Sequence, residues 1–335
     1  NLKPKIMKMF TKFLLFAIVA NVMFGSTAFG QILQRGTATN ATTTNTTLTI
    51  TKPTGVVAGD VMLANIAQGG NNSVAPTSAG WTIVDGRSLA GNTQRYGSVF
   101  YRVADGTEGA SFTFTLGAGT DAASGSIVAF SGVNGTGGVT ATGAAGGPFD
   151  VDPGIILVPG SGSTTVNATT TTTVSANAAV IMLGEAAGAN PTWSAWSTTS
   201  PGALTELYDN PNGSNTQTSV GAAWAIKPIA GATGGGTATL STSERNGGLL
   251  VALKPGISTP TATLSPVETQ YILTGGNVVF TATASNFTGS GNYTYTWATP
   301  GATITGTSPN TIAASSDTKT LTYAAAGTYT VIVTI

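Results

Sequence analysis

The residue types that most enzymes use for nucleophilic catalysis or for zinc binding are missing from this sequence. It contains no histidine and no cysteine. A catalytic triad needs a base beside its nucleophile, usually His, and structural or catalytic zinc is held mainly by Cys and His. We therefore expect no enzymatic activity of that kind and no cofactor.

Glycoside hydrolysis is the remaining acid–base chemistry to consider, because it needs only two carboxylates that flank a cleft. The glutamates of this chain occur singly among predicted strands and loops. They are Glu108, Glu185, Glu206, Glu244 and Glu268. Such scattered acids do not predict a glycosidase, and we expect the protein not to be an enzyme.

One pair of acids has the spacing of a weak calcium site. Asp150 and Asp152 stand in the segment Asp-Val-Asp-Pro-Gly, and Ca²⁺ takes carboxylates and loop carbonyls as ligands. The same residues also favour a plain turn, because Asp side chains bond to nearby backbone and Pro-Gly continues the turn. The turn is the preferred interpretation, and calcium is the alternative.

Two tryptophans, Trp193 and Trp196, suggest a contact with carbohydrate. They stand close together in Pro-Thr-Trp-Ser-Ala-Trp, and aromatic rings can pack on the faces of sugars. On a regular strand, however, residues three apart point to opposite faces. Packing in a core or an interface is therefore preferred, with a glycan contact as the alternative.

The charge of the chain argues against nucleic acid and anionic membranes as partners. Thirteen basic and thirteen acidic residues balance over the whole sequence, but four lysines lie within the first twelve positions. Without them, nine basic residues face thirteen acidic ones, a net charge of about −4. Binding to phosphates or to anionic lipid needs clustered Lys and Arg.

The first thirty residues have the pattern of a secretory leader. Lysines precede the apolar run 13–20, and small residues follow up to Gly30. This order of charged, apolar and small residues is typical of a signal peptide, with cleavage after Gly30. An uncleaved anchor is the alternative, but a span needs about 20 apolar residues. We expect a secreted or cell-surface protein without a membrane span after cleavage.

The mature chain is predicted to be all-β. Short segments that alternate or run apolar are separated by Gly, Pro, Asn and Asp, as in 111–116, 126–130 and 178–183. No segment has the spacing of an amphipathic helix. We expect a jelly-roll-like β-sandwich over 31–254, a Pro- and Ser/Thr-rich linker over 255–260, and a second sandwich over 261–335.

Residues 261–335 resemble a PKD or immunoglobulin-like domain. The resemblance rests on Val278–Ala282, Tyr293–Trp297 and Gly327–Val333, in that order and spacing. It implies that Trp297 fills the core between two sheets and that the 327–333 strand crosses it. The family often has Gly-Asp-Gly after the Trp, whereas Ala-Thr-Pro-Gly follows here, so any role tied to that Asp is lost.

Residues 32–254 resemble a sandwich module of secreted bacterial surface proteins. The matching segments are Gly59–Leu63, Gly80–Trp81, Tyr101–Ala104, Ser131–Val133 and Val251–Pro255. Together with the leader and the PKD-like segment, they resemble surface proteins of the Bacteroidetes type. Such proteins often end in a sorting domain. The sequence stops at Ile335 on a predicted strand, so a longer natural chain is one expectation.

These patterns favour an extracellular structural or adhesive protein, with a filament subunit as one form. Residues 37–51 predict a long, nearly uncharged strand, which is an edge liability unless paired. It could join a neighbouring subunit by strand addition, or pair within its own domain. The residues of the possible donor segment are Thr42, Thr44, Thr46, Leu48 and Ile50. The alternative function is that of a carbohydrate-binding, non-catalytic part of a larger secreted enzyme. From these two functions, the expected partners are other copies of this chain or surface glycans.

Overall fold

The computed structural model forms two compact units, one over Gly30–Gly256 and one that contains Ile257–Ile335. It describes residues 31–89, 95–188, 190–256, 261–267, 270–271, 273, 275–285 and 292–335. The predicted leader, residues 1–30, lies outside the described residues. Throughout these ranges the elements are antiparallel strands and no α-helix occurs, which confirms the all-β class. None of the described residues forms a helix that could cross a membrane.

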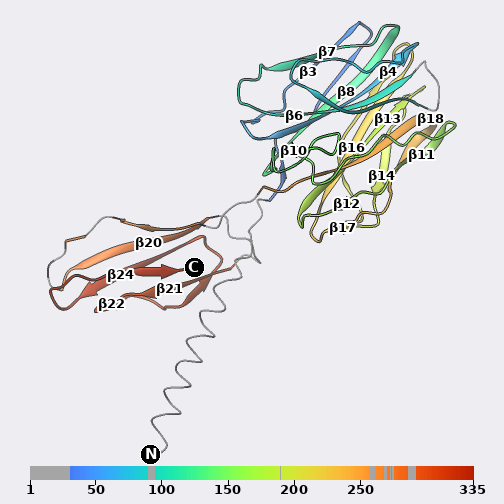
Figure 1. The fold of residues 1–335 in the computed structure, drawn as a ribbon. Helices are drawn as coiled ribbons and strands as arrows, with labels where there is room; N and C mark the ends of the chain where they lie inside the picture. Colours follow the sequence, from blue (N-terminus) through green and yellow to red (C-terminus); the bar gives the residue numbers. More distant parts are fainter. Residues whose placement is uncertain are drawn as a thin grey trace, which may run out of the picture. The chain divides into compact units, whose positions relative to one another are not determined.

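Two six-stranded sheets build the N-terminal unit (Figure 1). The first has the order β1-β8-β4-β6-β5, with β2 also paired to β8. Its strands are β1 (Leu33–Gln34), β2 (Thr39–Thr43), β4 (Val61–Gly70), β5 (Thr82–Ser88), β6 (Tyr96–Val103) and β8 (Thr120–Ser131). The second has the order β11-β18-β13-β16-β15, with β14 also paired to β18. Its strands are β11 (Ser163–Ala168), β13 (Ala178–Ala187), β14 (Trp193–Ser197), β15 (Thr205–Asn212), β16 (Thr218–Lys227) and β18 (Gly236–Leu253).

The two sheets repeat one topology. The order β8-β4-β6-β5 of the first matches β18-β13-β16-β15 of the second. Each half also has a separate two-stranded pair, β3 (Thr47–Thr51) with β7 (Ser111–Thr115), and β12 (Thr172–Thr173) with β17 (Gly231–Ala232). The sequence carries a trace of this repeat, since 40–44 and 167–171 both read Asn-Ala-Thr-Thr-Thr. The repeat was not among the sequence-based expectations.

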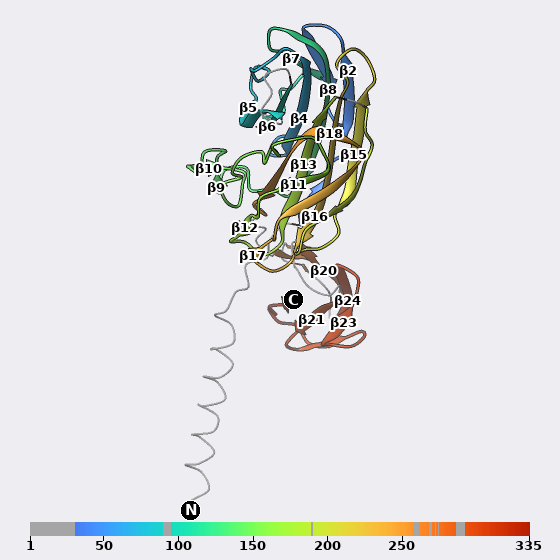
Figure 2. The same ribbon diagram turned by 90° about the vertical axis from the view of Figure 1, so that its right-hand side faces the viewer.

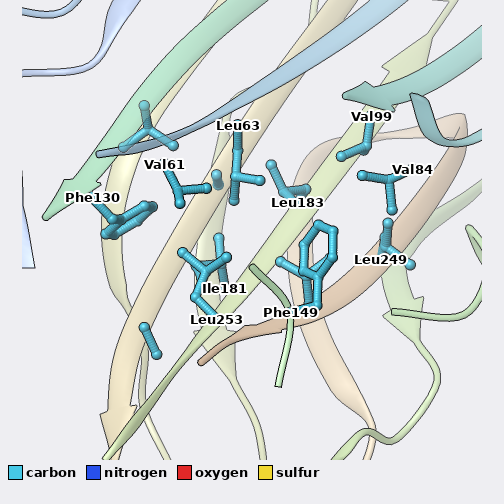
Figure 3. Close-up of a cluster of buried hydrophobic side chains, with 14 of the residues drawn as sticks. Val61, Leu63, Val84, Val99, Phe130, Phe149, Ile181, Leu183, Leu249 and Leu253 are labelled. Atoms are coloured by element: carbon cyan, nitrogen blue, oxygen red, sulfur yellow. The ribbon is translucent and has the colours of Figure 1, made fainter. Parts of the chain in front are cut away.

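A central apolar core joins the two sheets (Figure 3). Alternate residues of β4 and β13 face it, among them Leu63 and Ile181, both fully buried. Phe149, from the segment between the two halves, also packs there. Because the opposite faces of β4 and β13 are covered as well, both strands are buried along their length. This explains why their sequences are nearly continuous apolar runs.

Each sheet has a second, outer core. In the first half, Met62 and Ile66 pack against residues of β3 and β7. In the second half, Val180 and Met182 pack against residues of β14 and β18. A small pair, β9 (Gly138–Val139) with β10 (Ala145–Gly147), extends to one side of the unit (Figure 2). The N-terminal unit is thus a sandwich of two similar halves, each with a core of its own.

The C-terminal unit is a smaller sandwich. One sheet has the order β19-β20-β24-β22 and the other β23-β21-β25. The strands are β19 (Thr261–Ser265), β20 (Asn277–Ser285), β21 (Tyr293–Ala298), β22 (Ala302–Ile304), β23 (Asn310–Ile312), β24 (Ser316–Tyr323) and β25 (Ile332–Thr334). Trp297 is buried in the core with Phe280, Tyr295 and Leu321. The predicted strand 327–333 is shorter than expected, because β25 begins only at Ile332.

Candidate functional site

The expected N-terminal strand is two strands separated by a bend. β2 pairs with β8, with Thr42 opposite Ser124, and β3 pairs with β7. Thr44 and Thr46 lie in the bend between them. The single long strand predicted over 37–51 is therefore wrong, and both of its parts are paired within the N-terminal unit.

The side chains of β3 explain where this segment goes. Leu48 lies opposite Phe114 and Ile50 opposite Phe112, and the two aliphatic side chains are 1% and 0% exposed. They cover the outer face of the first sheet, where Gly125 of β8 leaves room for both. Burying each such side chain stabilises the folded unit by about 1.5–3 kcal/mol. Pairing within the unit is therefore more stable than leaving the strand free at an edge.

The two tryptophans lie in a core, not on a surface. Trp193 and Trp196 are 4% and 5% exposed, and their rings stack with centroids 5.2 Å apart and planes 15° apart. Each indole N–H is used internally, Trp193 Nε1 donating to Ser219 Oγ at 2.8 Å and Trp196 Nε1 to Glu206 Oε2 at 3.1 Å. The proposed glycan contact through these residues is corrected, because neither ring face is open.

A backbone irregularity places both indoles on the same side of β14. Ala195 has φ 52°, and the register with β18 shifts between Ser194 and Ser197. A residue in this left-handed region breaks the strict alternation of a strand. The three-residue spacing therefore does not separate these two rings. Gly184 and Gly221 make room for the pair, since a Cβ on either would meet the Trp193 ring at less than 3 Å.

The surroundings of Asp150 and Asp152 favour the turn interpretation over the calcium alternative. Asp150 is 4% exposed and faces Lys254, with Nζ 3.5 Å from Oδ1. Its Oδ2 accepts bonds from the backbone N–H groups of Val174 and Ser175, at 2.7 and 3.0 Å. Asp152 is exposed and accepts the Gly154 N–H, at 2.8 Å, as in a turn. The Lys254 ammonium pairs with the Asp150 carboxylate, and no group of three or more metal-ligating side chains occurs in the described ranges.

Asparagines join the two halves of the N-terminal unit. Asn65 Nδ2 of the first sheet donates to Gly184 O, at 3.0 Å. In the opposite direction, Asn210 Nδ2 donates to Gly125 O at 2.9 Å and Asn212 Nδ2 to Ala123 O at 3.0 Å. Sequence reasoning missed these residues, because an Asn in a strand gives no sign of which backbone it will reach.

A fully buried carboxyl lies in the same interface. Glu185 is 0% exposed, and within the described residues neither carboxyl oxygen has a hydrogen-bond partner. Burial raises its pKa well above the ordinary value, and the charge of Asp85 adds to the rise. Burial also raises the pKa of the nearby Tyr208. Burial and the Asp85 charge thus favour the protonated form of Glu185, whose side chain has no exposed surface.

A second polar cluster lies inside the C-terminal sandwich. Asp317 Oδ1 accepts bonds from Lys319 Nζ at 3.0 Å and from Asn310 Nδ2 at 2.9 Å. Asp317 Oδ2 accepts the Trp297 Nε1 proton at 2.8 Å. Burial raises the pKa of Asp317, but these hydrogen bonds, led by that from Trp297, outweigh it and lower the pKa.

The buried tryptophan and the two-sheet order agree with a family model over the whole C-terminal segment. Residues 261–335 match the PKD domain. No curated protein was found to match the chain. A search of solved structures found no match either. The family match therefore covers the C-terminal unit and does not extend to the N-terminal unit.

Proposed function

We propose that this chain is a secreted, non-catalytic structural or adhesive protein of the bacterial cell surface, of the Bacteroidetes type. The observation that carries the proposal is the PKD domain over 261–335, a module that suggests an extracellular adhesive or structural role. In this proposal residues 1–30 are a cleaved leader, 31–254 a sandwich domain and 255–260 a linker. The absence of His and Cys from the sequence supports a role without catalysis.

The proposal includes assembly of copies through the N-terminal segment 31–51. Leu48 and Ile50 insert into the outer core of the first sheet, and they belong to the first strands after the leader. A second copy could supply the same two side chains to the same place, because exchange of a terminal element keeps every contact of the original fold. Strand addition would then occur by exchange, and not through an unpaired edge.

An engineered disulfide tests this assembly. Thr49 of β3 and Thr113 of β7 are direct cross-strand partners, with hydroxyl oxygens 3.0 Å apart, and the chain has no other cysteine. In the variant Thr49→Cys/Thr113→Cys, oxidation of monomers ties β3 to its own domain. We expect oxidised monomers to stay monomeric and reduced ones to assemble, measured by light scattering and negative-stain microscopy.

A matched disulfide in the PKD domain provides the control. Thr281 of β20 and Thr318 of β24 are also cross-strand partners with hydroxyls 3.0 Å apart, and that pair has no part in the exchange. Oxidation of Thr281→Cys/Thr318→Cys should leave assembly unchanged. Wild-type protein that remains monomeric at every concentration would end the assembly proposal.

The broader role is tested by location and ligand. Antibodies to the PKD domain should label intact cells, and labelling only after lysis would contradict an extracellular role. The alternative, a glycan-binding part of a larger enzyme, now lacks its sequence motif, because Trp193 and Trp196 are buried. Specific binding of the full chain on a glycan array would still favour that alternative.

A further inference from the structure

We propose that Lys319 and Asn310 join through an intramolecular isopeptide bond, with Asp317 as the proton carrier. The bond would form between Lys319 Nζ and Asn310 Cγ, with release of ammonia. It would link the two sheets of the PKD domain covalently, since Lys319 lies on β24 of one sheet and Asn310 on β23 of the other.

The placement of the lysine is the first argument. Along β24, alternate residues face the core, namely Asp317, Lys319, Leu321 and Tyr323. Lys319 is only 5% exposed and Asp317 only 6%. A lysine is almost never buried to this extent unless it is paired. The Lys319 side chain is thus enclosed in the sandwich, with its amine on the Asp317 carboxylate.

The shared oxygen is the second argument. Asp317 Oδ1 lies 3.0 Å from Lys319 Nζ, the nucleophile, and 2.9 Å from Asn310 Nδ2, the leaving nitrogen. The Trp297 indole holds the other carboxylate oxygen at 2.8 Å, which fixes the carboxylate. One oxygen in contact with both nitrogens is the geometry that a proton shuttle needs.

The reaction balances without any further reagent. Lys319 gives one ammonium proton to Asp317 Oδ1, and the freed lone pair forms the Nζ–Cγ bond with Asn310. Asp317 passes the proton to Nδ2, and the Cγ–Nδ2 bond breaks with its electrons on nitrogen. The second surplus proton of Nζ leaves with the ammonia, so an ammonium side chain and a carboxamide become a secondary amide and an ammonium ion.

The shared oxygen favours this step. Holding the amine and the carboxamide on one oxygen replaces a bimolecular encounter by a fixed arrangement. A slow reaction is sufficient, because each molecule needs it only once.

Mass spectrometry of the full chain tests the proposal. Loss of ammonia lowers the mass by about 17 Da, but cyclisation of an N-terminal Gln31 would do the same, so the loss must be located. Trypsin should no longer cut after Lys319, and the peptide 320–335 should stay joined to 246–319, with fragment ions that place the bond between Lys319 and Asn310. Full release of 320–335 with an unmodified mass would overturn the proposal.

Three variants complete the test. Lys319→Arg keeps the cation and the trypsin site, and Asn310→Ala removes the acylating group. Both should release 320–335 and give the peptide 246–319 at its unlinked sequence mass. The role of Asp317 is tested by Asp317→Ala, which should leave the lysine unlinked; linkage at the wild-type rate would overturn its role as proton carrier.

Discussion

Replacing the buried Glu185 by glutamine should remove a pH dependence from the stability of the N-terminal unit. The folded-state pKa of Glu185 is raised by burial and by Asp85, whereas an unfolded glutamate titrates at about 4.3. The stabilising contribution is therefore complete below that pH and is lost as the pH rises toward the folded-state pKa. Across this window one extra proton is bound in the folded state, so stability falls by about 1.4 kcal/mol per pH unit.

That slope can be measured as a difference between two proteins. For a unit of this size it corresponds to about 3–6 °C of melting temperature per pH unit. Calorimetry of wild type and Glu185→Gln between pH 4 and pH 8 should show the variant gaining on wild type as the pH rises. Other titrating groups cancel in this difference, because they are common to both proteins.

A surface carboxyl is the control for the same experiment. Asp152 is exposed and accepts one backbone N–H, and Asp152→Asn keeps an acceptor there. This variant should follow the wild-type pH profile. A constant difference between wild type and Glu185→Gln at all pH values would refute the view that Glu185 is buried as a neutral acid.

Three further predictions concern the features that the structure corrected. Trp193→Ala should lower the free energy of unfolding by about 3–5 kcal/mol, whereas Ile229→Ala, at a side chain 78% exposed, should change it by less than about 0.5 kcal/mol; denaturant titration compares them. Asp150→Ala should cost about 1–3 kcal/mol, because two backbone N–H groups and Lys254 lose their acceptor, and millimolar calcium should leave the wild-type melting temperature unchanged; a rise with calcium would restore the metal site. Ala195→Gly should be neutral or stabilising by up to about 1 kcal/mol, because φ 52° is strained for alanine; a clear loss in thermal unfolding would contradict the left-handed geometry.

The buried polar groups of the N-terminal unit lie where its two similar sheets meet. Two similar sheets pack face to face, apolar where Leu63 meets Ile181 and polar where Asn65 reaches the other sheet. The Nδ2 groups of Asn65, Asn210 and Asn212 donate across the interface and so favour one way of docking, because a shift would leave these donors buried without acceptors. Glu185 lies in the same interface without a partner among the described residues, which is why its titration should report on this docking.

The sequence by itself determined what each segment is made of and which class of fold results. Alternating and continuous apolar runs predict strands because the period of a strand is local, and the order around Trp297 was enough to predict the PKD sandwich. Composition likewise argued against catalysis based on His or Cys, because the sequence contains neither. These inferences depend on residues that are neighbours along the chain.

Only the tertiary structure decided which partner each side chain meets. Leu48 could face a neighbouring subunit or its own sheet, and the uncovered outer face of that sheet determined the choice. Trp193 and Trp196 could be a platform or a core, and one left-handed residue placed both inside. Asp150 could bind calcium or a lysine 104 positions away, and Lys254 was the one brought to it. In each case the deciding contact joins residues far apart in sequence, which local pattern and composition do not encode.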